Sequence, residues 1–148
     1  IKEVMPDAFI GVDVIVGTRG ETEEYFEDAY RFIAGLDVTQ LHVFSYSERP
    51  GTQALKIDHV VAPEEKHKRS QRLLALSDEK TQAFYVRHIG QTMPVLMEKT
   101  KAGMPMHGFT ANYIRVEVEN DPSLDNKMVD VLLGELNEDG TALKGTIL

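Results

Sequence analysis

The sequence predicts an α/β segment followed by a small all-β barrel. Its first part alternates strand, helix and strand patterns, which is typical of a βαβ unit. Its last part changes to the two-residue periodicity of β-strands, with several short strands separated by turns. We therefore expect an α/β piece over 1–62, a connecting helix over 63–89 and a barrel over 90–148.

The α/β piece is expected to hold two parallel strands joined by one helix. Val12–Val16 is short, apolar and β-branched, which predicts a strand buried on both faces, and Leu41–Tyr46 predicts a second strand. Between them, Thr22 marks a helix start. An apolar helical stripe follows through Phe26, Ala29, Tyr30 and Ile33. The acids around this start are expected to be solvated: Glu21, Glu23, Glu24, Glu27 and Asp28.

The second half is expected to hold one long helix and five strands. Pro63 suits the first position of a helix that runs to about His88 and ends at Gly90. The predicted apolar stripe of this helix is Leu73, Leu76, Ala83 and Val86. Five short strands predict a closed antiparallel barrel, because closure removes exposed edges. Alternation places six side chains inside it: Ile114, Val116, Val118, Val129, Val131 and Leu133.

Composition excludes several classes of protein. The chain has 148 residues and no cysteine, so it holds no disulfide and no cysteine-bound zinc or iron–sulfur cluster. No apolar run is long enough to span a membrane and no signal-peptide pattern is seen, which fits a cytoplasmic protein. The five histidines show no metal-ligand spacing. A net charge of −8 argues against strong nonspecific nucleic-acid binding, and we expect no DNA partner.

A glycine-rich turn follows the first strand at Gly17–Glu21. Such a turn lets a backbone approach a ligand closely and offers N–H groups at a helix start, although as an isolated pattern it is more often simple turn chemistry. It lacks the spacing of a nucleotide-binding P-loop. The turn alone therefore does not identify a ligand.

The order of five segments carries a resemblance that covers essentially the whole chain. These segments are DVIVG-TRGETEEYF, LHVFSYSERPGT, a basic helix begun by proline, GQTMPVLME and GFTANYIRVEV. Together they resemble the methylthiotransferase family of radical-SAM enzymes, in its C-terminal part. The HVF-YS-RPGT segment looks most like the branch that acts on tRNA bearing threonylcarbamoyl-adenosine beside the anticodon. Thr18 and Arg19 depart from the family pattern, which has Phe-Pro at these positions.

The resemblance implies a fold and cofactors. Residues 1–62 would form the end of a radical-SAM α/β barrel, and residues 90–148 would form a TRAM domain, an OB-like barrel. The complete protein would use S-adenosylmethionine and two iron–sulfur clusters. In this chain we expect no catalytic residue, no metal ligand and no tightly bound cofactor. Ile15, Gly17, Phe44 and Tyr46 would line the S-adenosylmethionine site, although Ile15 also suits ordinary barrel core.

The resemblance also implies an RNA partner, the anticodon stem-loop of a tRNA. Tyr113 and Arg115 are expected to project from one strand face, suited to base stacking and phosphate contact. Thr110 and Asn112 lie beside them, and Lys68 and Arg69 belong to a basic patch with Lys66 and Arg72. Such runs of charge are more often solvated helix faces.

Two alternatives stay open on the sequence. One is the related branch that modifies an aspartate of a ribosomal protein. The other is a non-enzymatic OB-type RNA-binding module, although such a module would not need the βαβ piece with its glycine turn. Unpaired edges of the barrel piece also predict self-association.

Overall fold

The computed structural model describes residues 1–148 and divides them into two compact units. The α/β unit is Ile10–Lys80, and the barrel unit combines Ile1–Phe9 with Thr81–Leu148. The expected domain boundaries at residues 62 and 89 stay a prediction. None of the helices is long and apolar enough to cross a membrane.

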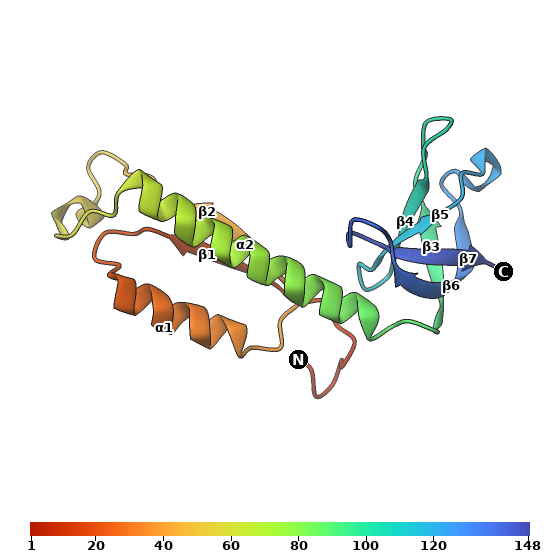
Figure 1. Cartoon of the computed structure of the whole chain (residues 1–148), viewed down its shortest axis with the longest axis horizontal. Helices are drawn as coiled ribbons and strands as arrows, with labels where there is room; N and C mark the ends of the chain where they lie inside the picture. The colour runs from red at the N-terminus through yellow and green to blue at the C-terminus, as the bar shows by residue number, and fades with distance from the viewer. The chain divides into compact units, whose positions relative to one another are not determined.

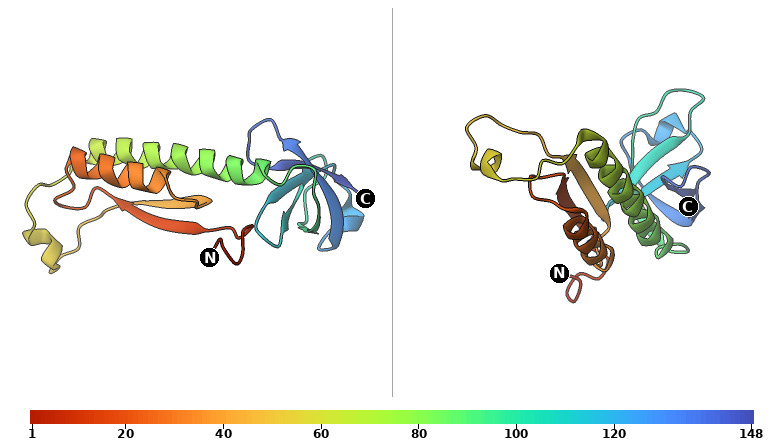
Figure 2. Two further views of the ribbon diagram at one scale, coloured as in Figure 1. Left: turned by 90° about the horizontal axis from the view of Figure 1, so that it is seen from below. Right: turned by 60° about the vertical axis from the view of Figure 1, so that its left-hand side comes forward.

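The α/β unit confirms the predicted βαβ arrangement. Strand β1 (Gly11–Val16) leads through helix α1 (Glu23–Ala34) to strand β2 (Gln40–Ser45), and the two strands pair in parallel. The Thr22 hydroxyl caps α1 by accepting a hydrogen bond from the Tyr25 N–H at 3.2 Å. A 3-10 turn, Gln53–Lys56, interrupts the loop after β2. Helix α2 (Pro63–Val86) begins in this unit, and Figures 1 and 2 show α1 and α2 on the same side of the two strands.

One face of the two-stranded sheet is buried and the other is exposed. Val16, Phe26, Leu41, Leu73 and Leu76 form the buried cluster between the sheet and the helices. The prediction that β1 is buried on both faces was wrong. Side chains alternate between the faces of a strand, and both helices cover the same face, so every second residue of β1 is exposed.

The predicted apolar stripe of α2 was right in its first half only. Leu73 and Leu76 are buried, but Ala83 is exposed and Phe84 is buried in its place. At 3.6 residues per turn, Phe84 lies roughly 20° around the helix axis from Leu73. Val86 lies nearly opposite Leu73 and is also exposed, so the continuous stripe passes through Phe84.

The barrel unit contains a closed five-stranded barrel, consistent with an OB-like fold. The strands are β3 (Thr92–Met97), β4 (Met106–Thr110), β5 (Arg115–Val118), β6 (Met128–Leu136) and β7 (Leu143–Ile147), with a 3-10 turn at Pro122–Leu124. Their order around the barrel is β3-β4-β5-β7-β6. The β5–β7 pair is parallel, which corrects the expectation of an antiparallel barrel. Five strands cannot alternate direction around a closed ring, so at least one neighbouring pair must be parallel.

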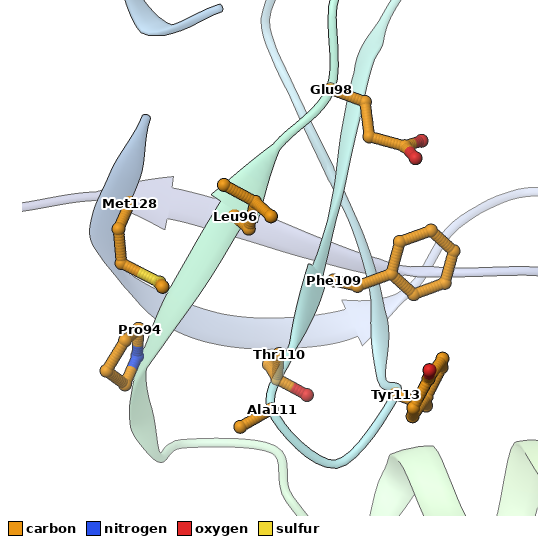
Figure 3. Close-up of a pocket in the computed structure, with 8 residues that line it drawn as sticks. All are labelled: Pro94, Leu96, Glu98, Phe109, Thr110, Ala111, Tyr113 and Met128. Atoms are coloured by element: carbon orange, nitrogen blue, oxygen red, sulfur yellow. The ribbon is translucent and has the colours of Figure 1, made fainter. Parts of the chain in front are cut away.

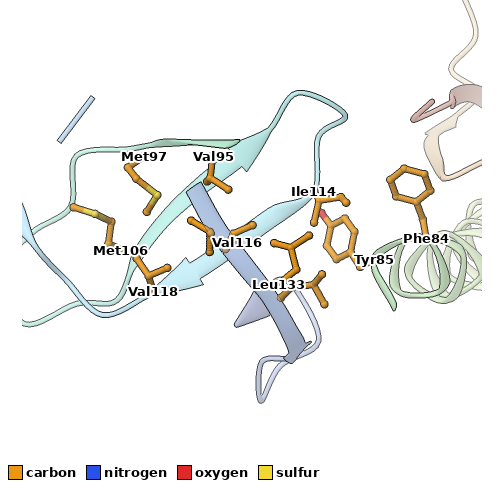
Figure 4. Packing of buried hydrophobic residues seen from close by; sticks show 11 residues of the cluster. Phe84, Tyr85, Val95, Met97, Met106, Ile114, Val116, Val118 and Leu133 are labelled. Atoms are coloured by element: carbon orange, nitrogen blue, oxygen red, sulfur yellow. The ribbon is translucent and has the colours of Figure 1, made fainter. Parts of the chain in front are cut away.

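The interior of the barrel matches the predicted alternation. Ile114, Val116, Val118, Val131 and Leu133 are buried, and Val129 is partly buried against them. Figure 4 shows Tyr85, from the end of α2, beside Ile114 and Leu133.

Residues 1–9 belong to this barrel unit and form a series of turns. The Phe9 ring stands edge-on to the Phe84 ring, with 5.5 Å between their centroids. Phe9 is therefore packed, partly buried, against the hydrophobic core of the unit.

Candidate functional site

Two predicted cofactor residues meet on the exposed face of the α/β unit. The parallel register places Ile15 of β1 directly opposite Phe44 of β2. Their side chains are 56% and 53% exposed, which is unusual for neighbouring large apolar residues on a sheet. This face can therefore present an apolar wall to a ring or to another part of a protein.

Lys66, which was expected in the basic patch of the connecting helix, contacts both Gly17 and Tyr46. Gly17 has φ +74°, and its N–H donates to Glu21 Oε1 at 2.9 Å. A Cβ at Gly17 would lie 2.3 Å from Lys66 Cγ, so the close approach predicted at this glycine is made by Lys66. Lys66 Nζ donates to the Tyr46 carbonyl at 3.0 Å and lies 5.3 Å from the centre of the Tyr46 ring.

Arg69 is buried rather than displayed on a basic surface. Its side chain is 4% exposed, and Nη1 lies 2.7 Å from Glu21 Oε1 and donates to the Glu21 carbonyl at 3.0 Å. Nη2 lies 3.3 Å from Glu23 Oε2. Arg69 therefore holds the glycine-rich turn and is not part of an accessible RNA-binding surface in this structure.

The rest of the predicted basic patch is largely neutralised by acids. Arg72 binds both carboxylate oxygens of Glu27, and Lys68 lies 3.4 Å from Glu64. Hydrogen bonding to Arg72 lowers the pKa of Glu27 below its ordinary value, although partial desolvation opposes this shift. The expectation that the acids around the start of α1 are solvated was wrong for Glu21 and Glu27, because α1 and α2 pack side by side and place these two acids opposite bases. Glu23 is exposed, as expected, although it lies near Arg69. Lys68, at 62% exposed, remains accessible.

The turn between β4 and β5 displays Tyr113. The Thr110 hydroxyl accepts from the Ile114 N–H at 3.0 Å and donates to Asn112 Oδ1 at 2.7 Å. Asn112 Nδ2 in turn donates to the Asp7 carbonyl at 3.1 Å. Thr110 is buried, so these two residues close the turn instead of offering free polar groups. Tyr113 lies in the turn with φ +62° and is 67% exposed, so it does not project from the strand as predicted.

An apolar groove lies beside this turn on the outer surface of the barrel (Figure 3). The groove has a volume of about 590 Å³. Figure 3 shows Phe109 and Tyr113 together on one side, with Pro94 and Met128 on the other. The lining residues are Pro94, Leu96, Glu98, Phe109, Thr110, Ala111, Tyr113 and Met128. Sequence reasoning missed the groove, although Leu96 and Met128 occupy outward positions of their strands.

The predicted RNA residue Arg115 lies next to the groove on β5. It is directly opposite Phe109, and its Nη1 lies 3.3 Å from Thr141 Oγ1. The nearby acid Glu117 accepts from Asn137 Nδ2 at 2.9 Å and lies 3.0 Å from His107 Nε2. Its carboxylate is therefore held by two polar side chains on the outer face of the barrel.

No group of three or more His, Cys, Asp or Glu side chains is placed to hold a metal ion. The parallel βαβ unit and the grooved five-stranded barrel define an α/β segment joined in one chain to an OB-like module.

Comparison with curated proteins identifies the family. The chain is 33% identical over 135 residues to the threonylcarbamoyladenosine tRNA methylthiotransferase MtaB of Bacillus subtilis (strain 168), covering 88% of this chain and 30% of that protein. It is 34% identical over 133 residues to the tRNA-2-methylthio-N(6)-dimethylallyladenosine synthase of Symbiobacterium thermophilum, covering 88% of the chain and 28% of that protein.

A synthase of the same name from Aliarcobacter butzleri (strain RM4018) is 32% identical over 151 residues, covering 100% of the chain and 34% of the relative. The chain belongs to the tRNA methylthiotransferase family. It spans about a third of the length of the curated relatives it matches. No family model matches the chain.

Proposed function

We propose that this chain is part of a tRNA methylthiotransferase that adds a methylthio group to N6-threonylcarbamoyl-adenosine next to the anticodon. The observation that carries the proposal is the 33% identity to a threonylcarbamoyladenosine tRNA methylthiotransferase across 88% of the chain. The OB-like barrel supports it, because such barrels commonly bind oligonucleotides on their outer strands and loops.

The α/β unit would contribute one wall of the S-adenosylmethionine site in a radical-SAM barrel. Ile15 and Phe44 form an exposed apolar pair on adjacent parallel strands, which suits the face of an adenine ring. Gly17 and Tyr46 lie at the carboxyl ends of the same strands, the end at which α/β barrels bind ligands. S-adenosylmethionine, when bound, would supply the radical and the methyl group.

This chain offers no fit for an iron–sulfur cluster. Clusters are held mainly by cysteine thiolates, and the sequence has none. The structure also lacks any grouping of alternative metal ligands. We therefore assign no cluster ligand within these 148 residues.

The barrel would bind the anticodon stem-loop through Tyr113 and Arg115. Tyr113 is accessible for stacking, and the Arg115 guanidinium lies on the outer surface of β5, where it can contact phosphate. Lys68 would add one accessible positive charge from α2. Thr110 and Asn112 would act by holding the turn that displays Tyr113.

The substrate is tested by nucleoside mass spectrometry of tRNA from cells that lack the gene encoding this chain. The proposal predicts loss of the methylthio form of threonylcarbamoyl-adenosine and accumulation of the unmethylthiolated nucleoside. Reintroducing the gene should restore the modified form. Retention of the methylthio group at normal levels in the deletion strain would contradict the proposal.

A second substrate is favoured by the names of other relatives. The Symbiobacterium and Aliarcobacter proteins are named as tRNA-2-methylthio-N(6)-dimethylallyladenosine synthases, at 34% and 32% identity. If the chain acts in that branch, the deletion strain would lose the methylthio group from dimethylallyl-adenosine instead. The same mass spectrum therefore separates the two candidates.

A further inference from the structure

The outer surface of the barrel carries one apolar row that crosses three strands and ends in a cation on a fourth. Leu96 on β3 lies directly opposite Met128 on β6 and Phe109 on β4. Phe109 in turn lies directly opposite Arg115 on β5. The four side chains are therefore neighbours across the sheet, in the order Met128, Leu96, Phe109 and Arg115.

Much of this row is open to solvent, although Phe109 is half-buried. Leu96 is 45% exposed, Met128 is 65% exposed and the neighbouring Tyr113 is 67% exposed. The interior of the barrel is filled by the other face of each strand, so the row contributes little to the core. Contiguous exposed apolar surface of this kind marks a place where a ligand or partner binds.

We propose that the groove holds one unpaired base of an RNA strand. The base would stack against the Tyr113 and Phe109 rings above the apolar floor formed by Leu96, while Arg115 contacts an adjacent phosphate. The inference rests on the proposed function and adds to it: the barrel recognises an unstacked loop nucleotide rather than the paired stem.

The ring geometry suits a single flat ligand. The ring centroids of Phe109 and Tyr113 are 6.4 Å apart, and the ring planes are tilted by 59°. A base stacked on one ring therefore meets the edge of the other, and both arrangements are favourable for aromatic groups. Figure 3 shows the two rings on the same side of the groove, with Leu96 and Ala111 between them and the side of Pro94 and Met128.

The charge of the barrel favours binding of an unpaired nucleotide over binding of an RNA duplex. Residues 90–148 carry five basic and nine acidic side chains, a net charge of −4 (5 minus 9). Recognition of paired RNA relies on many phosphate contacts, which this surface cannot provide. One unpaired nucleotide needs only a local cation, and Arg115 ends the row while Lys127 precedes Met128. Glu98 also lines the groove and adds an acidic group that limits the number of phosphates it can accept. The local charge therefore complements one or two phosphates and no more.

A weak dependence on salt follows from this charge distribution. For single-stranded nucleic acid, the logarithm of the binding constant falls by about 0.7 per neutralised phosphate for each tenfold rise in salt. One or two contacts therefore predict a slope of roughly −0.7 to −1.4. Stacking accepts any base, so exchanging the loop bases should change affinity little.

The experiment compares two leucines on the barrel surface of the whole chain. Leu96 lines the groove, whereas Leu132, at 38% exposed, lies on the outer face of β6 away from the groove lining. A fluorescent anticodon stem-loop and a fully paired duplex of the same stem are titrated into the wild type, Leu96→Ser, Leu132→Ser and Tyr113→Ser. Circular dichroism of each variant checks that the fold is retained.

The proposal expects Leu96→Ser and Tyr113→Ser to weaken stem-loop binding by roughly fivefold or more, as loss of base stacking does. Leu132→Ser should bind as the wild type does, and the duplex should bind more weakly than the stem-loop. Equal effects of the two leucine variants, or equal affinity for duplex and stem-loop, would overturn the groove as the base site while leaving RNA binding intact. If the wild-type chain binds neither RNA, the inference and the RNA-binding part of the proposed function both fail, whereas the nucleoside analysis still tests the reaction.

Discussion

Replacing Arg69 with methionine should destabilise the α/β unit strongly, because it removes the central cation of a buried cluster. Arg69 is 4% exposed and lies within ion-pair distance of Glu21, Glu23 and Glu65. Removing one partner of a buried ion pair typically costs about 3–5 kcal/mol, because the other charge stays buried without compensation. Methionine preserves the length of the side chain and most of its packing, so the substitution tests the charge.

The structure places the expected cost at the lower end of that range. Glu21 is 15% exposed but keeps a hydrogen bond from the Gly17 N–H, while Glu23 and Glu65 are 62% and 37% exposed and can be solvated. We therefore expect Arg69→Met to lower the free energy of unfolding by about 3 kcal/mol. Lys68→Met is the matched control on the same helix, because its exposed pair with Glu64 should be worth only about 0.3–0.5 kcal/mol.

Urea unfolding followed by far-UV circular dichroism measures both variants. The chain has no tryptophan, and most of its helical signal comes from α1 and α2. The free energy is obtained by linear extrapolation to water, with the slopes of the variants compared to confirm that the same structure unfolds. If Arg69→Met stays within about 0.5 kcal/mol of Lys68→Met, the buried cluster does not stabilise the α/β unit.

Three further predictions concern acid stability, barrel packing and strand edges. The pKa of Glu27 is lowered in the folded state by its hydrogen bond to Arg72, so its stabilising contribution is present above the unfolded value of about 4.3 and is lost as pH falls through the folded value. Urea midpoints measured from pH 6 down to about pH 3 should fall less steeply with decreasing pH in Arg72→Met than in the wild type. If both proteins lose stability equally over this range, the Glu27–Arg72 pair does not contribute to the pH dependence of stability. Gly108→Ala should destabilise the barrel by roughly 1–3 kcal/mol, because the new Cβ would lie 2.5 Å from the Leu96 carbonyl oxygen. A Cβ at Gly11 would lie 3.7 Å from its nearest neighbouring atom, so Gly11→Ala should be nearly neutral. Thermal unfolding of the two variants measures this difference. Strands β1 and β2 pair only with each other, so the open edges should drive concentration-dependent association that multi-angle light scattering detects; a monomer with both strands fully protected from hydrogen exchange would contradict this.

The elements of the fold could be predicted because local periodicity determines them. The alternation of Ile114, Val116 and Val118 identified the side of β5, and of the residue before it, that faces the barrel interior. The strand–helix–strand pattern identified the parallel pair of strands. The stripe of α2 was misplaced beyond Leu76, because Ala83 and Phe84 differ by only 100° around the helix and packing against the barrel selects the larger side chain.

The candidate sites depended on contacts that no local pattern reveals. Arg69 was expected at a basic surface, but its burial follows from the packing of α2 against the acidic start of α1. The groove requires the register that aligns Leu96 with both Met128 and Phe109, residues that are distant in sequence. Ile15 and Phe44 were both expected at the S-adenosylmethionine site because of the resemblance, but their direct pairing follows only from the parallel register of β1 and β2.

NMR of the methionine methyl groups tests most directly the central claim that the barrel groove binds RNA. Met128 is 65% exposed in the groove, whereas Met97 and Met106 are buried in the barrel core at 1% and 0% exposure. Adding the anticodon stem-loop to methyl-labelled chain should shift the Met128 signal, because its side chain lines the groove that the base enters, and should leave Met97 and Met106 in place. An unmoved Met128 signal at saturating RNA would contradict the account.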